Sequence, residues 1–348
     1  MASDSILFQE IQEQPDVIAR FWQNGQRALA ELVAGMRVAD IRQIVIAARG
    51  TSDNAARYAQ YLLGAGNRLP VMLTTPSLFT LYQRPPLFAP GTLVLGISQS
   101  GQSPDIVSVL AEGKRQGHLT AAITNSEASP LAQQADHVVA LGAGRERSIA
   151  ATKTYTAQLF AVGLLSAHLA GDADRIDTLQ QAPSLLRQTL AMNGEVERLA
   201  ERYRYMRNCV VVGRGYNYST TFEIALKLKE LTYTLAEPYS SADFLHGPVS
   251  LIEPGFSAIV VASSGILAAE MRALVEQLRG LKAELLCVSS DDSILENGRS
   301  RFPFPPVPDW LSPLLAVVPG QLLALYLALA RDFDPDHPRG LSKVTETR

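Results

Sequence analysis

The sequence is poor in the residues that disulfide-bonded, metal-binding and nucleic-acid-binding proteins need. Its only two cysteines, Cys209 and Cys287, each lie in an apolar, strand-like run, which predicts buried, reduced thiols and no disulfide framework. There is no CxxC pair, and the five histidines are scattered without metal-ligand spacing, so no metal site is expected. A net charge of −3 without a basic stripe argues against a nucleic-acid or membrane-surface partner.

The sequence also shows no pattern typical of a signal peptide or a membrane-spanning helix. The first four residues lead into neither a basic nor an apolar signal region, so no signal peptide is expected. The apolar run 311–330 contains Pro319, Gly320 and Gln321 and lacks flanking basic anchors, which predicts a buried helix rather than a membrane span. With 47% hydrophobic and 19% charged residues among 348, we expect a globular, cytoplasmic protein of two domains.

What the sequence does contain is an internal repeat. Strand-like apolar runs alternate with helical patterns, as in a parallel sheet covered by helices on both faces. The pattern predicts two tandem copies of one doubly wound α/β domain, each with three αβα layers. The copies match at an offset of about 164 residues, in the runs 44–50 and 209–215, 93–101 and the run ending at 265, 119–123 and 283–287, and 158–159 and 321–322.

The repeat divides the chain into five segments. We expect an N-terminal helical lead-in over residues 1–34, domains over 35–172 and 198–335, a helical linker over 173–197 and a tail over 336–348. The linker is charged and rich in leucine at helical spacing, whereas the tail is polar and is expected to be irregular.

The most informative stretch is residues 98–103, which we call the serine loop. The apolar run 93–97 predicts a buried strand before it, and a helix is expected over 104–116, with Ser103 as N-cap and Pro104 at its first position. The backbone N–H groups and the dipole of such a helix start favour an anion. No P-loop lysine is present, so one phosphate monoester is the expected ligand, and an ordinary strand-to-helix turn is the alternative. Neutral donors come from Ser98, Gln99, Ser100 and Ser103.

In the second copy the equivalent stretch, residues 263–267, has lost the glutamine and the third hydroxyl. We call it the counterpart loop. The asymmetry predicts one active site per chain, built mainly on loops of the first copy and completed by the second.

Two other segments carry candidate residues: one follows the first strand at the same sheet edge, and the other opens the helix that ends the first copy. Thr51 and Ser52 offer hydroxyls at a helix start, where they either face the same crevice as the serine loop or only cap the helix. Ala150 and Ala151 are small enough for a ligand to approach the backbone. Lys153 either contacts a phosphate or faces water.

Three charged residues, Glu223, Lys227 and Glu230, share one face of a predicted helix. They are either ordinary surface ion pairs or a carboxylate base, Glu230, with Lys227 beside it, as aldose–ketose proton transfer requires. His246 precedes a Gly-Pro pair and is expected on a loop, where a histidine can assist sugar ring opening. Lys343, in the tail, would by itself be a solvated side chain.

In combination, and in this order, these motifs resemble the SIS (sugar isomerase) domain family, and most closely the isomerase half of glutamine–fructose-6-phosphate aminotransferases. The similarity covers nearly the whole chain and implies two flavodoxin-like SIS domains. The motifs are Arg49-Gly-Thr-Ser, Ser98-Gln-Ser-Gly, Ala151-Thr-Lys, Glu223-x3-Lys-Leu-Lys-Glu, Leu245-His-Gly-Pro and Pro338-Arg-Gly-Leu-x-Lys-x-Thr.

The resemblance implies a role for each candidate. Glu230 moves a proton between C1 and C2 with support from Lys227. His246 opens the sugar ring and comes from the neighbouring subunit, which implies a homodimer. Lys343, in a tail that closes over the substrate, forms an imine with the open-chain ketose. No cofactor is implied. The sugar phosphate is bound through Thr51, Ser52, Ser98, Gln99, Ser100, Ser103, Ala150, Ala151 and Ser342.

Two departures refine the expected reaction. Ala2 stands where the synthase has a glutaminase cysteine, and Ala151 replaces a serine common in the synthase. The chain therefore looks more like stand-alone SIS-type deaminases, which convert D-glucosamine 6-phosphate and water to D-fructose 6-phosphate and ammonia. The alternatives are a deglycase of a fructosamine adduct, a galactosamine 6-phosphate deaminase, an isomerase that uses external ammonia and a non-catalytic sugar-phosphate sensor.

Overall fold

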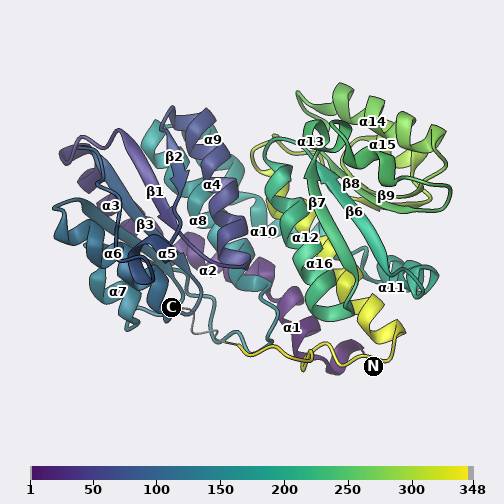
Figure 1. The fold of residues 1–348 in the computed structure, drawn as a ribbon, viewed down its shortest axis with the longest axis horizontal. Coiled ribbons are helices and arrows are strands. Elements are labelled where there is room, and N and C mark those ends of the chain that lie inside the picture. The colour runs from purple at the N-terminus through teal and green to yellow at the C-terminus, as the bar shows by residue number, and fades with distance from the viewer. Residues whose placement is uncertain (1, 344–348) are drawn as a thin grey trace. The chain divides into compact units, whose positions relative to one another are not determined.

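The computed structural model describes residues 2–343, and within them the chain forms two parallel five-stranded sheets. The first has the strand order β2-β1-β3-β4-β5 and the second has the order β10-β9-β8-β6-β7, so the same pattern occurs twice. Every pairing is parallel, and helices flank both sheets (Figure 1). The predicted fold of two tandem doubly wound α/β domains is confirmed.

The chain divides into two compact units, and the first contains residues 14–146, 153–182 and 342–343. Its strands are β1 (Gln43–Ala47), β2 (Val71–Leu73), β3 (Thr92–Ser98), β4 (Leu119–Thr124) and β5 (His137–Ala140). Its helices are α2 (Gln14–Asn24), α3 (Gln26–Val38), α4 (Thr51–Asn67), α5 (Ser77–Thr80), α6 (Pro104–Arg115), α7 (Pro130–Gln134), α8 (Lys153–Ala170) and α9 (Ala173–Gln180).

The second unit contains residues 2–13, 147–152 and 183–341. Its strands are β6 (Asn208–Gly213), β7 (Leu235–Ser240), β8 (Ser257–Ala262), β9 (Glu284–Ser289) and β10 (Ser300–Pro303). Its helices are α1 (Ile6–Gln12), α10 (Ala182–Leu190), α11 (Asn193–Ala200), α12 (Asn217–Thr232), α13 (Ser241–Leu245), α14 (Ala268–Gly280), α15 (Asp292–Asn297) and α16 (Ser312–Ala330), with short 3₁₀ turns at Ala2–Asp4, Glu201–Tyr203 and Pro248–Leu251.

The first sheet is a layer between two sets of helices. All seven residues of β3 are buried, as expected for a central parallel strand covered on both faces. Helix α6 presents Ile106, Val109 and Leu110 to the sheet, where they pack with Val94 and Leu131. Helices α4 and α8 lie side by side in the same unit (Figure 1). The apolar stripe of α6 decides which side of that helix faces the sheet, whereas α8 is buried on nearly all sides.

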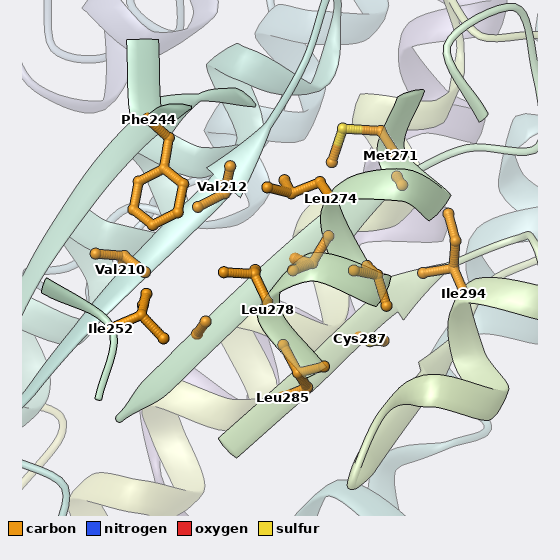
Figure 2. Packing of buried hydrophobic residues seen from close by; sticks show 14 of the residues in the cluster. Val210, Val212, Phe244, Ile252, Met271, Leu274, Leu278, Leu285, Cys287 and Ile294 are labelled. Carbon is orange, nitrogen blue, oxygen red and sulfur yellow. The ribbon is translucent and has the colours of Figure 1, made fainter. Parts of the chain in front are cut away.

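The second unit has an equivalent core between its sheet and helix α14 (Figure 2). Met271, Leu274 and Leu278 project from one face of α14 toward the strand residues Val210 and Val212. Burying each such side chain stabilises the fold by roughly 1.5–3 kcal/mol, so this stripe fixes the helix on the sheet.

The two cysteines lie in strands of this second sheet, Cys209 in β6 and Cys287 in β9, and both are free. Burial raises the pKa of each thiol to about 12. The predicted buried, reduced cysteines are confirmed.

Helix α16 is long and apolar enough to cross a membrane by length and composition alone. In the structure it continues through Pro319, and almost all of its length is buried against α11 and α12. It is thus a core helix of the second unit, as its interrupting residues and missing basic anchors predict.

The chain after α16 forms no regular element up to Lys343. Asp336 nevertheless has a defined place, since its carboxylate accepts hydrogen bonds from the backbone N–H groups of Ile6 (2.8 Å) and Leu7 (2.8 Å) and from the Ser5 hydroxyl (2.9 Å). It thereby caps the first turn of α1. The last residue of the tail motif, Thr345, lies outside the described residues, as does the rest of the predicted tail after Lys343.

Candidate functional site

The candidate sugar-phosphate groups of the first unit lie at the topological switch point of its sheet. Strands β1 and β3 are neighbours, with Ala47 opposite Gly96, but their connections run to opposite sides of the sheet, to β2 and to β4. In doubly wound folds ligands bind where the loops diverge beyond the carboxyl ends of such strands. The loop before α4 and the serine loop both start from this edge.

The serine loop is a compact turn that uses its own hydroxyl groups. The Ser98 hydroxyl accepts a hydrogen bond from the Gly101 N–H (3.1 Å), and the Ser100 hydroxyl accepts one from the Gln102 N–H (3.3 Å). Gly101 has φ +64°, and a Cβ there would lie 2.2 Å from Ser129 Oγ, so only glycine fits. Both hydroxyl groups keep a hydrogen that can be donated to an anion.

The helix after the loop begins as predicted, with Ser103 at the N-cap position and Pro104 in the first turn. The expected capping bond is not formed, however, because the Ser103 side chain makes no hydrogen bond to the first turn of α6. The buried carboxylate of Asp105 accepts instead from the N–H of Ile106 (2.9 Å) and from Arg49 Nε (2.8 Å). No local sequence signal predicts this ion pair, which joins the two loops at the switch point.

Helix α4 begins at Thr51, as predicted, and Ser52 in its first turn is buried. The Ser52 hydroxyl accepts a hydrogen bond from Gln158 Nε2 on α8 (3.0 Å). Gln158 Oε1 is buried and has no hydrogen-bond partner within residues 2–343. Gln158 is therefore a buried polar residue of this region that the sequence motifs do not predict, since it appears in them only as part of the internal repeat.

The structure excludes one of the two environments predicted for Lys153, at the start of α8. Lys153 is only 3% exposed and donates a hydrogen bond to the carbonyl of Arg145 (3.0 Å), so the prediction that it faces water is wrong. The aliphatic stem is buried while the amine is paired with a carbonyl oxygen. Ala150 is buried and Ala151 is half-buried.

The tail lysine lies in this same first unit. Lys343 Nζ is 3.0 Å from Oε2 of Glu146, whose side chain is fully buried. Lys343 therefore has a carboxylate partner, whereas a lysine in a chain tail is usually fully solvated. The neighbouring Ser342 is exposed.

The candidate acid–base groups belong to the second unit and lie on α12. Lys227 Nζ is 2.6 Å from Glu230 and 3.4 Å from Glu223, which places one ammonium between two carboxylates. Lys227 and Glu223 are fully buried, so the interpretation as surface ion pairs is wrong. Glu230 alone is partly open, with 21% of its side chain exposed. Glu223 thus anchors Lys227, which in turn orients the accessible carboxylate.

His246 ends the short helix α13 and is exposed, in agreement with display at a loop. No hydrogen bond or ion pair joins it to Glu230 within residues 2–343.

The counterpart loop of the second unit is occupied by a side chain of the chain itself. Asp309 accepts hydrogen bonds from the Ser263 hydroxyl (2.6 Å) and from the Ile266 N–H (2.9 Å). This approach requires Gly265, because a Cβ at that position would overlap the Asp309 carboxylate. The donors of the counterpart loop are therefore bound by a carboxylate, whereas the serine loop is closed by its own hydroxyl groups.

Two tandem doubly wound domains, one with a hydroxyl-rich loop and the other with a carboxylate–lysine cluster on a helix, define the class of α/β protein to which this chain belongs. The chain belongs to the SIS domain family, whose model matches residues 37–167 and 204–331. The predicted family is confirmed.

Individual relatives agree with this assignment. A glutamine–fructose-6-phosphate aminotransferase (isomerizing) of Pseudomonas syringae pv. tomato is 31% identical over 97% of this chain and 58% of its own length. The chain thus spans little more than half of this curated relative. The C-terminal domain of glucosamine-fructose-6-phosphate aminotransferase from Francisella tularensis is 25% identical, with a TM-score of 0.86 over 96% of this chain and 98% of that chain. A glucosamine-6-phosphate deaminase from Thermotoga maritima shares the fold (TM-score 0.79, 23% identity, 99% of this chain and 100% of that chain).

Proposed function

We propose that this SIS-family enzyme is a deaminating aldose–ketose isomerase, which converts D-glucosamine 6-phosphate and water to D-fructose 6-phosphate and ammonia. The observation that carries the proposal is the cluster on α12, where buried Lys227 holds the partly exposed carboxylate of Glu230 at 2.6 Å. A fixed carboxylate that solvent and substrate can reach is the usual agent of proton transfer between adjacent carbons.

The reaction divides into three proton-transfer stages. His246 assists opening of the pyranose ring, which frees the C1 aldehyde. Glu230 then removes the C2 proton and returns it to C1, while one proton of the amino group passes to O1, which changes the amino aldose into a ketose imine. Water adds to C2 of the imine, and the C–N bond breaks to release ammonia and leave the C2 carbonyl.

The phosphate contributes remote binding energy. We assign its recognition to Ser98, Gln99, Ser100 and Ser103, whose neutral donors meet the α6 N-terminus at the switch point. Anchoring the phosphate helps hold C1 and C2 where the base can act. Ser52 is assigned to the sugar side, where Gln158 orients its hydroxyl.

The proposal includes a cytoplasmic homodimer in which His246 comes from the neighbouring subunit. The exposed position of His246 and its lack of a contact with Glu230 within residues 2–343 are compatible with this arrangement. A mixed dimer of Glu230→Gln and His246→Ala chains tests it, because exchange of histidines regenerates one complete site and therefore restores part of the turnover. No recovery would place His246 and Glu230 of one chain in the same site.

The direct test incubates the purified protein with D-glucosamine 6-phosphate and measures ammonia and fructose 6-phosphate. Both products should form in equal amounts. Glu230→Gln should lower turnover by about 10³-fold while sugar-phosphate binding persists. Absence of turnover with every phosphorylated amino sugar, including galactosamine 6-phosphate and fructosamine adducts, would reject the enzyme function and leave a sugar-phosphate sensor.

The aminotransferase names of the relatives favour a second candidate, an isomerase that uses external ammonia to make glucosamine 6-phosphate. This is the same chemistry in the opposite direction, so the KM for ammonium distinguishes the two. A deaminase should require ammonium far above cellular concentration, whereas a synthesising enzyme should saturate at low ammonium.

A further inference from the structure

The proposed function assigns no role to Glu146, although its carboxylate is buried and held by several hydrogen bonds. It precedes α8, and both of its oxygens are bound within the first unit. Oε1 accepts from the Thr154 N–H (3.1 Å), and Oε2 accepts from the Thr154 hydroxyl (2.8 Å). Oε2 also accepts from Lys343 Nζ (3.0 Å). Contacts on both oxygens fix the orientation of the carboxylate as well as its position.

Such a carboxylate requires compensation for its lost hydration, and the structure supplies it from two sides. The N-terminal turn of α8 provides an N–H group and the positive end of the helix dipole. Lys343 provides an ammonium, and its side chain is 26% exposed while that of Glu146 is fully buried. The amine is therefore attached to the folded unit at one defined point and still reaches solvent.

A second lysine of the region has a different recorded partner. Lys153, at the start of the same helix, donates to the Arg145 carbonyl (3.0 Å). One lysine of the region thus stabilises the backbone, and the other brings an irregular segment to a charged partner 197 residues earlier in the chain.

We propose that Glu146 is the positioning residue for Lys343: it holds the ammonium in place and exchanges the proton that imine formation requires. This inference rests on the proposed function, because it takes fructose 6-phosphate as a ligand of the enzyme, and it takes from the SIS resemblance that Lys343 is the amine that reacts with the ketose. The ammonium passes a proton to Glu146, and the neutral amine attacks C2 of open-chain fructose 6-phosphate, which forms a C–N bond. The carbonyl oxygen becomes a hydroxyl with the second amine proton. Glu146 returns its proton to that hydroxyl, which leaves as water, and the products are an iminium ion and the original carboxylate.

The test traps the iminium by reduction. The full-length protein is incubated with fructose 6-phosphate and cyanoborohydride, and mass spectrometry follows the reduced adduct at Lys343. Glu146→Gln keeps the size of the side chain but loses the proton acceptor, so trapping should slow by about 100-fold. The KM for the sugar phosphate should stay within about twofold, because the phosphate groups are untouched. Glu146→Asp, which keeps the charge on a shorter arm, should recover part of the rate.

Thr154→Val is the matched control, since it removes one hydrogen bond to the same carboxylate without changing the Lys343 contact. It should reproduce any loss of stability at the start of α8 and leave the trapping rate within about threefold of the wild type. If Glu146→Gln does not fold, Glu146→Asp and Thr154→Val carry the comparison.

The outcomes separate this inference from the proposed function. Equal trapping in wild type and Glu146→Gln, or equal loss in Thr154→Val, overturns the role of Glu146. Turnover of glucosamine 6-phosphate without any wild-type adduct at Lys343 also overturns it, but leaves the deaminase standing. Absence of both turnover and adduct rejects the two together.

Discussion

The serine loop and the counterpart loop hold equivalent places in two copies of one domain, after β3 and after β8, yet their donors are used differently. The serine loop is closed by its own hydroxyl groups. The counterpart loop is closed by the carboxylate of Asp309, which binds one hydroxyl and one backbone N–H. The counterpart loop thus accepts an anionic group, which a side chain of the same unit provides.

The ion pairs beside the two loops also differ, in their length and in the exposure of the carboxylate. Arg49 pairs with Asp105 at 2.8 Å, and the carboxylate is 1% exposed. The residues at the corresponding positions of the second copy, Arg214 and Glu270, are 3.7 Å apart, and the carboxylate is 41% exposed. The ion pair beside the serine loop is the shorter and more buried one, which agrees with the proposed role of that loop in binding phosphate.

The comparison is tested most strongly by removing hydroxyl groups from each loop in turn. Ser100→Ala with Ser103→Ala should weaken sugar-phosphate binding by about 100-fold, because hydrogen bonds to a charged group contribute about 1.5–3 kcal/mol each. Ser263→Ala with Ser264→Ala should leave affinity within about twofold. Calorimetric titration with fructose 6-phosphate measures both.

Stability provides the control for that pair. Ser103 makes no capping bond, and Ser100 accepts one exposed hydrogen bond, from the Gln102 N–H, so the first double variant should lose no more than about 1 kcal/mol of stability despite its altered binding. Equal losses of affinity in the two loops would show that the copies do not divide their roles in this way.

The two loop glycines offer the next largest effect. Gly101→Ala places a Cβ at φ +64° and against Ser129, the N-cap of α7, and should cost at least about 2 kcal/mol of unfolding free energy. Gly265→Ala places its Cβ against the Asp309 carboxylate, which can turn away if it gives up its hydrogen bonds, so about 1 kcal/mol should be lost. Urea unfolding at one pH compares them, and a costlier Gly265→Ala would contradict the order.

Breaking the two arginine pairs should produce a smaller difference. Arg49→Met leaves buried Asp105 without its cation and should cost about 1.5 kcal/mol, less than for a fully buried pair because Arg49 is half exposed. Arg214→Met should cost under about 0.5 kcal/mol, as is usual for an exposed, long ion pair. Denaturant midpoints at constant m-value provide the measurement, and equal costs would mean that the scaffolds are equally important.

Sequence patterns predicted the features that depend on local periodicity. The offset between copies located β1 with β6 and β4 with β9, and the i, i+3, i+4 spacing on α12 placed Lys227 beside Glu230. These features were accessible because hydrophobic spacing and side-chain neighbours along one helix are properties of short stretches.

Contacts between distant segments were not predictable in the same way. The Ser52–Gln158 bond joins residues 106 apart, and the Asp309 contact with Ser263 joins residues 46 apart. Neither partner carries a local signal that names the other, since each pairing is decided by how the elements pack. For the same reason the burial of Lys153 followed from its place in the fold and not from its residue type.

The smallest expected effect distinguishes the helices that follow the fourth strands of the two sheets. The α15 N-cap is Asp291, which accepts from the Ile294 N–H (3.2 Å), and its hydrogen bond from Arg272 holds the pKa of the carboxyl below its ordinary value. The α7 N-cap is the uncharged Ser129, which accepts from the Ala132 N–H (3.3 Å). A lowered folded-state pKa contributes stability above the unfolded pKa and loses it as pH falls through the folded one.

Asp291→Ser should therefore cost about 1 kcal/mol at about pH 7, and the cost should shrink as pH falls below about 4 and the wild-type carboxyl becomes protonated. Ser129→Ala should show a cost that does not change with pH, because no titrating group is removed. Urea unfolding of both variants and the wild type across this range measures the two differences. A constant cost for Asp291→Ser would mean that its hydrogen bonds matter and its charge does not, so that the two copies cap these helices by equivalent means.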